Sequence, residues 1–341
     1  MKYILFTLHG YLELFKKKGE KTLFDYARKE NFERFVENGI WGFVLLDTTI
    51  EKSYFKFLFP EGVFPGESFF RILKYDIQAK GNETFFLGKF ASLIDGKIIE
   101  TEVNLNFNEK KCLLDEIKKK IKNGDIFLFE DEIILKINTD IPMTFRRFPN
   151  KIKGKYIREI LFKKKLFKKI DDLILNFSSL LITHPINKVR YDLNEPVANF
   201  LYLYGMGKYS EKVLLSEKIK KEIFYYSDLD KIDGLCKFFG FNKINNISEF
   251  KDNSLYWLNF SLNYKASPSI WVKNFESFAS NILKNINFGE DTKFLFIFDP
   301  FINPDYEYER KYSIFLASNF HSKIREKYKV SSILFKEFIE R

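Results

Sequence analysis

Histidine and cysteine are scarce in this chain, and their scarcity narrows the kinds of site that it can hold. The two cysteines, Cys112 and Cys236, lie far apart and lack the CxxC spacing of zinc and redox motifs. A disulfide framework and a cysteine-based zinc site are therefore excluded, and we expect a protein of the reducing cytoplasm. The three histidines are His9, His184 and His321. A metal centre that needs several imidazole ligands therefore has at most three histidines available.

Long apolar runs are also missing. No segment approaches the roughly 18 apolar residues of a membrane span, and the apolar run after Lys2 is too short for the core of a signal peptide. The net charge is +10, but the lysine runs at 16–18, 118–120 and 163–165 lie in helical patterns whose other face is apolar. Such runs are typical of solvated helix faces. No RNA-binding or basic-aromatic motif occurs, so we expect neither a nucleic acid nor a membrane as a partner.

Phenylalanine, by contrast, is abundant, with 41 among 341 residues. A phenylalanine-rich core needs no cofactor to explain it, because aromatic side chains bury large apolar areas. Short apolar segments alternate with helical patterns, and several are near-continuous apolar runs, as in a sheet that helices cover on both faces. We expect strands at 3–8, 41–47, 199–205, 222–227, 255–262, 293–299 and 313–318.

The middle of the chain has a different pattern. Strand-like pieces surround a lysine-rich helix expected at 109–122, and a long amphipathic helix is expected at about 155–181. We therefore expect an inserted α+β cap domain at 79–194. The α/β core is then built from 1–78 and 195–341, with a mostly parallel central sheet covered by helices on both faces.

Three segments resemble a known family. They are GEKTLFDYARKENFERFVENGIWG (19–42), FPEGVFPGES with the following ILKYD (59–76), and HPINKVRYDLNEPVANFLYLYGMG (184–207). Together they resemble the archaeal-type cofactor-independent phosphoglycerate mutases of the alkaline phosphatase superfamily. The likeness covers nearly the whole chain, weakly in the cap. The third segment is the most specific because it matches nine residues in order: His184, Pro185, Asn187, Arg190, Pro196, Ala198, Asn199, Gly205 and Gly207.

This resemblance implies an alkaline-phosphatase-like core with an inserted cap, and the interconversion of 3- and 2-phosphoglycerate. A serine takes the phosphoryl group and returns it to the other hydroxyl. Two divalent metals, manganese or magnesium, activate the serine and hold the phosphate oxygens, since a metal pair stabilises both the attacking and the leaving oxygen. Such a pair needs roughly six or seven Asp, His and Ser ligands at strand ends.

The chain departs from this pattern at the residues that do the chemistry. His9 stands where the family has its first aspartate ligand. In the loop of the nucleophile, Glu67 occupies the serine position, unless Ser68 serves with a slip of one residue. A glutamate cannot replace a serine as a reversible phosphoryl carrier without a different, mixed-anhydride chemistry.

The later ligands are altered as well. Asn259 stands in place of a ligand histidine, and Asp299 is kept but is followed by Pro300. The family needs three ligand histidines in its C-terminal half, whereas only His321 follows residue 190 here. We therefore do not expect a two-metal site of the family type.

A reduced site is one alternative. His9, Glu13, Glu67, Asp299 and Asp305 can face one cleft in the inferred fold, and a single Mn or Mg ion with two carboxylates and an imidazole is chemically reasonable. The other interpretation is that these are leftover polar residues at a solvated sheet edge. Beyond such an ion we expect no cofactor.

Two interpretations also apply to the best-matching segment. Arg190, with His184 beside it, can bind a substrate carboxylate or phosphate, as guanidinium geometry favours. Alternatively, Asn187 and Arg190 bond backbone carbonyls and clamp the junction between cap and core. We favour the structural interpretation, because this segment keeps its pattern while the ligands are lost. Arg146 and Arg147 can bind a phosphate, but we favour a solvated loop for them.

The sequence thus predicts a degenerate relative of these mutases, a pseudoenzyme that binds a phosphorylated small molecule or a protein partner, or has a regulatory role. One alternative is an active, divergent phosphoglycerate mutase or phosphatase with a reduced metal site at His9, Glu67 and Asp299. Another is a structural subunit that pairs with a genuine mutase. The sequence predicts no oligomeric state.

Overall fold

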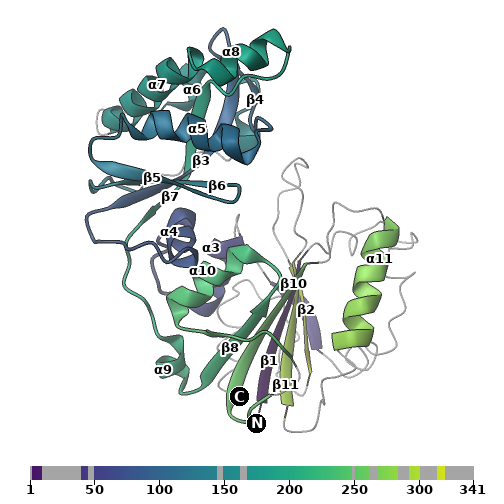
Figure 1. Ribbon diagram of the computed structural model, residues 1–341. Helices are drawn as coiled ribbons and strands as arrows, with labels where there is room; N and C mark the ends of the chain where they lie inside the picture. The colour runs from purple at the N-terminus through teal and green to yellow at the C-terminus, as the bar shows by residue number, and fades with distance from the viewer. Residues whose placement is uncertain are drawn as a thin grey trace. The chain divides into compact units, whose positions relative to one another are not determined.

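The chain folds into two compact units, Met1–Phe64 with Lys212–Arg341 and Pro65–Glu211. Figure 1 shows the computed structural model, which describes residues 2–9, 40–44, 50–143, 149–161, 167–247, 250–261, 268–282, 292–299 and 313–318. Each unit has its own sheet. In the part of the chain that the structure describes, no helix has the length and apolar character needed to cross a membrane.

The first unit contains a seven-stranded sheet in the order β2-β12-β11-β1-β10-β8-β9. β1 pairs in parallel with both β10 and β11, and β8 continues the parallel part, while β12 runs antiparallel to β11 and β2. The mostly parallel sheet predicted from the sequence is therefore confirmed. The strands are β1 (Lys2–His9), β2 (Ile40–Val44), β8 (Glu222–Ser227), β9 (Asn242–Lys243), β10 (Ser254–Ser261), β11 (Thr292–Asp299) and β12 (Ser313–Ser318).

Helices cover this sheet on both faces, which explains the continuous apolar runs. Trp257 in β10 meets Tyr54 of α3, with ring centroids 5.2 Å apart, whereas Phe6 in β1 meets Phe278 of η3 at 6.2 Å. Trp257 is in register with Leu5, the neighbour of Phe6, so these two contacts lie on opposite faces. The helical elements are α3 (Ile50–Leu58), α9 (Leu215–Ile219), α10 (Asp230–Phe239), α11 (Pro268–Ser277) and the π-helical turn η3 (Phe278–Ile282).

The second unit contains a five-stranded sheet in which β4, β3, β6 and β5 follow one another and β7 also pairs with β3. All of its pairs are antiparallel. The strands are β3 (Thr84–Ile94), β4 (Lys97–Glu100), β5 (Gly124–Phe129), β6 (Glu132–Ile137) and β7 (Phe200–Lys208). The helices are α4 (Glu67–Lys74), α5 (Phe107–Lys118), η1 (Pro149–Lys151), α6 (Ile157–Ile160), α7 (Lys168–Ile182) and α8 (Pro185–Asp192).

The assignment of strand 199–205 to the parallel core is wrong. β7 pairs antiparallel with β3, so that Phe200 lies opposite Ala91 in the second unit. Both α4 and α7 pack against β7, and Figure 1 shows them on opposite faces of its sheet. A strand covered on both faces is apolar throughout, which is why β7 resembles a strand of a parallel sheet. The insertion predicted at 79–194 lies within this larger unit.

The helix predicted at 155–181 is also corrected, because it is not continuous. α6 ends at Ile160, and the next residue, Leu161, has an extended backbone with ψ of 151°. α7 then begins at Lys168. The helix predicted at 109–122 is α5, and it begins at a capping box in which Asn106 and Glu109 bond each other's backbone N–H groups.

One glycine is required where α4 begins. Gly66 has φ of 100°, and a Cβ atom on it would lie 2.0 Å from the carbonyl oxygen of Met206. We expect Gly66→Ala to lower the free energy of unfolding by at least about 3 kcal/mol. Gly96→Ala is the matched control, since φ is 73° there but nothing lies within 4 Å, and only the backbone strain of roughly 1–2 kcal/mol applies. Urea denaturation followed by circular dichroism measures both, and equal losses would contradict the packing argument.

Candidate functional site

The parallel strands of the first unit end at one edge of its sheet, where α/β folds place their ligands. At this carboxyl edge His9, the last residue of β1, is in register with Asp299 of β11 and with Ser261 of β10. The structure therefore brings the backbones of His9 and Asp299 together on neighbouring strands. Two other residues predicted for this site, Glu13 and Asp305, lie outside the described residues.

Asn259 lies two residues before the end of β10, and its side chain is used inside the sheet. The Thr7 hydroxyl donates a hydrogen bond to Asn259 Oδ1, and Trp257 Nε1 donates to the same Thr7 oxygen at 3.2 Å. All three side chains are fully buried. The residue that replaces a ligand histidine has thus become part of a buried hydrogen-bonded network, which stabilises the pairing of β1 with β10.

Asp228 is a further carboxylate at this edge, and the sequence analysis missed it. It follows directly after β8 and is exposed, and its backbone N–H donates to the carbonyl of Asn259 at 3.4 Å. A carboxylate placed directly after the apolar segment EIFYYS was the signal that could have identified it. The described part of the edge thus contains Asp299, His9, Asn259 and Asp228 on four successive strands or their ends.

Ser68 and Glu67 belong to the second unit, at the start of α4. Ser68 is fully buried, and its hydroxyl donates to the carbonyl oxygen of Phe85 in β3 at 3.0 Å. On its other side lies Gly207 of β7, where an added Cβ would come within 2.6 Å of Ser68 Oγ. The hydroxyl is therefore enclosed between two strands of its own unit. A slip of one residue does not make it an accessible nucleophile.

Glu67 is the first residue of α4 and is 8% exposed. It lies beside Gly205 and near Tyr204, whose pKa is raised by burial and, to a smaller extent, by neighbouring carboxylates that include Glu67. In the same helix Arg71 Nε pairs with Glu132 of β6 at 2.8 Å. These contacts fasten α4 to its sheet.

Arg190 uses its guanidinium group within the second unit. Its Nε donates to the carbonyl of Pro196 at 2.8 Å, one terminal nitrogen donates to Glu109 at 2.9 Å, and the other donates to the carbonyl of Asn104 at 3.1 Å. The side chain is buried. Glu109 also caps α5, so Arg190 joins the α8 turn to the start of α5. These contacts support the part of the structural interpretation in which Arg190 bonds backbone carbonyls, and all of them lie within the second unit.

His184 and Asn187 have similar local roles. His184 is the N-cap of α8, and its Nδ1 accepts a hydrogen bond from the backbone N–H of Ile186 at 3.2 Å. The Asn187 side chain donates to the carbonyls of Leu181 and Ala198 and accepts from the Ala198 N–H at 2.7 Å. The hydrogen bonds described for His184, Asn187 and Arg190 thus all connect parts of the second unit. Arg146, Arg147 and His321 lie outside the described residues.

No family model matches the chain. The 2,3-bisphosphoglycerate-independent phosphoglycerate mutase of Pyrococcus abyssi is 24% identical over 213 residues, which are 57% of this chain and 52% of that protein. The chain is thus similar in sequence to an archaeal cofactor-independent phosphoglycerate mutase. The resemblance predicted from the sequence is confirmed, although the match spans only about half the length of the curated relative.

Two solved structures have a fold similar to that of this chain. The cofactor-independent phosphoglycerate mutase of Thermoplasma acidophilum matches with a TM-score of 0.59 at 16% identity, over 99% of this chain and 98% of that one. A protein from Pyrococcus horikoshii matches with a TM-score of 0.64, also at 16% identity, over 93% and 87%. The α/β fold predicted from the sequence is therefore confirmed, and it is that of a cofactor-independent phosphoglycerate mutase.

The two-metal centre implied by the resemblance does not fit the residues that the structure describes. Within the described ranges, no three side chains of the His, Cys, Asp or Glu type are grouped so that they can hold a metal ion. Asn259 replaces an imidazole and is bound to Thr7. We therefore derive no reaction step through a metal pair. The single-ion site at His9, Glu67 and Asp299 stays a prediction.

A substitution at Arg190 tests its structural role. Lysine keeps the charge but cannot make three hydrogen bonds in the planar arrangement of a guanidinium, so we expect Arg190→Lys to lower the free energy of unfolding by about 2–3 kcal/mol. Lys188→Ala, on the exposed side of the same helix, is the control and should change it by less than about 0.5 kcal/mol. Chemical denaturation measures both, and an Arg190→Lys protein as stable as the control would refute the clamp.

Proposed function

We propose that this protein is a non-catalytic relative of the cofactor-independent phosphoglycerate mutases, which keeps their fold and acts by binding. The observation that carries the proposal is the position of Ser68. Its hydroxyl is buried and donates to the backbone of β3, and the residue before it, where the family has its nucleophile, is a glutamate. A reversible phosphoryl carrier must be able to reach both hydroxyls of its substrate. Neither Glu67 nor Ser68 supplies an accessible hydroxyl group that could act as this carrier.

The residues of the carboxyl edge support the same proposal. The chain has three histidines in all, and Asn259, in place of one ligand, is bound within the sheet. Function depends on the residues of the site rather than on the fold, so similarity to mutases in sequence and fold does not by itself assign mutase activity. The binding role we propose is for a phosphorylated small molecule or a protein partner in the cytoplasm.

One observation favours a second candidate, an active and divergent phosphoglycerate mutase or phosphatase. His9 and Asp299 are in register on neighbouring strands, which is where a reduced site of one hard cation would need an imidazole and a carboxylate. This candidate predicts turnover that depends on manganese or magnesium and falls when Asp299 is replaced by alanine.

A coupled assay for conversion of 3- to 2-phosphoglycerate, with manganese or magnesium added, decides between the two candidates. We expect no turnover above background from the full chain, with its folding verified by circular dichroism, and no difference between the wild type and Asp299→Ala. A genuine archaeal mutase assayed in parallel shows that the coupling enzymes work. Metal-dependent turnover that is lost in Asp299→Ala would overturn our proposal and support the second candidate.

Ser68→Ala separates a structural from a chemical role of the hydroxyl. The variant leaves the buried carbonyl of Phe85 without this donor, so we expect the free energy of unfolding to fall by about 1–2 kcal/mol. Ser179→Ala is the matched control, because Ser179 donates to a carbonyl of its own helix on an exposed face. Turnover in the wild type that Ser68→Ala abolishes, without loss of stability, would contradict the enclosed hydroxyl.

A further inference from the structure

The amino edge of the parallel sheet, at the opposite ends of the strands from His9 and Asp299, gathers two lysines around one aromatic ring. Lys293 of β11 is in register with Tyr3 of β1, and Lys221 directly precedes β8. The Nζ atoms of Lys221 and Lys293 lie 4.5 Å and 5.5 Å from the centre of the Tyr3 ring. Two ammonium groups therefore share one partly apolar environment.

Lys293 is an unusual residue for a sheet core. It is 7% exposed, and its buried Nζ has no hydrogen-bond partner among the residues that the structure describes. Burial lowers the pKa of the Lys293 ammonium below its ordinary value, and the positive charge of Lys221 lowers it further. Burying an ammonium is costly unless an anion or an acceptor compensates it.

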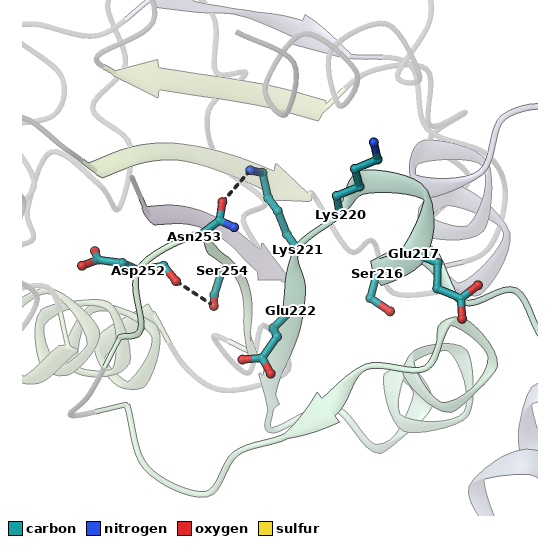
Figure 2. Close-up of a pocket in the computed structure, with 8 residues that line it drawn as sticks. All are labelled: Ser216, Glu217, Lys220, Lys221, Glu222, Asp252, Asn253 and Ser254. Carbon is teal, nitrogen blue, oxygen red and sulfur yellow. Dashed lines mark hydrogen bonds between the residues drawn. The ribbon is translucent and has the colours of Figure 1, made fainter.

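A cavity of about 520 Å³ is lined by Lys221, whereas Lys293 is not among its lining residues. Figure 2 shows the ammonium groups of Lys220 and Lys221 on one side of it, while the carboxylates of Glu217 and Glu222 extend to the other side. Lys221 Nζ donates to Asn253 Oδ1 at 3.1 Å. The full lining is Ser216, Glu217, Lys220, Lys221, Glu222, Asp252, Asn253 and Ser254.

Three carboxylates line the cavity, and two of them, Asp252 and Glu222, pair with lysines other than Lys221, while the third is Glu217. Asp252 pairs with Lys2 at 3.8 Å, and Glu222 pairs with Lys251 at 3.7 Å. Among the ion pairs between described residues, none involves Lys220, Lys221 or Lys293. With Lys2, Lys251 and Lys293 included, this edge holds five lysines against three carboxylates, and Lys221 lies next to a neutral amide and an aromatic ring.

We propose that the amino edge of the first sheet binds a phosphate group, held by the ammonium groups of Lys221 and Lys293 and bounded by Tyr3 and Asn253. A doubly charged oxyanion matches a pair of lysines in charge and supplies acceptors for both. The open cavity leaves room for the remainder of a phosphorylated small molecule. The site stands independently of the proposed function, because it uses none of the residues at the carboxyl edge or in the second unit.

Calorimetric titration of the full chain with inorganic phosphate, at constant ionic strength set with chloride, tests this site. We expect saturable binding and an increase in melting temperature, and about tenfold or more weaker binding in Lys221→Gln, which removes one charged hydrogen-bond donor. Lys251→Gln is the matched control, since it removes a lysine of the same edge that already pairs with Glu222, and it should change the affinity less than about twofold.

Lys293→Met provides a second, independent measurement. We expect this variant to melt at a higher temperature than the wild type in phosphate-free buffer, because it removes a buried ammonium that has no hydrogen-bond partner among the described residues. We also expect it to lose the phosphate-dependent increase in melting temperature. If the variant does not fold, the comparison of Lys221→Gln with Lys251→Gln decides. No phosphate binding by the wild type, or equal weakening by these two variants, would overturn the proposal.

A phosphate monoester titrated in the same way distinguishes the sources of the phosphate group. Glycerol 3-phosphate that binds more tightly than inorganic phosphate, with the same dependence on Lys221, would identify a phosphorylated small molecule as the ligand. Equal or weaker binding of the monoester, again dependent on Lys221, would identify the free anion.

Discussion

The parallel pairing of β1 with β10 and β11 is the constraint on which the first unit depends. These strands come from the two ends of the chain, Lys2–His9 against Ser254–Ser261 and Thr292–Asp299. Their side chains are buried on both faces, so the hydrophobic free energy of the whole sheet is available only when the ends meet. The same pairing aligns His9 with Asp299 at one edge and Tyr3 with Lys293 at the other.

Much of this sheet could be predicted from the sequence. The apolar segments of β1, β8, β10 and β11 differ from helical patterns because they lack polar positions at a 3.6-residue period. β7 shows the limit of that reasoning. It is covered by α4 and α7 and is apolar for the same reason as β1, and only its antiparallel partner β3 reveals that it belongs to the second unit. Pairing partners are a long-range property that a local pattern does not contain.

The candidate site was predictable in position and only partly in chemistry. The ends of apolar strands located His9 and Asp299, and the scarcity of histidine argued against a metal pair without any coordinates. The hydrogen-bond partners of Ser68 and Asn259 could not be predicted from the sequence. Whether a hydroxyl or a carboxamide faces a ligand or bonds the protein itself depends on Phe85, Gly207 and Thr7, which are distant in sequence.

Both edges of the sheet contain buried polar side chains, among them Asn259 and Lys293. A catalytic group must keep donors or acceptors available for its substrate, and this lowers the stability of the empty protein. Asn259, with Thr7 and Trp257, does the opposite, since it bonds inward and adds to the core. Lys293 has no hydrogen-bond partner for its buried ammonium among the described residues. The network of Asn259 thus adds stability at the carboxyl edge, whereas Lys293 lowers the stability of the amino edge unless an anion compensates its charge.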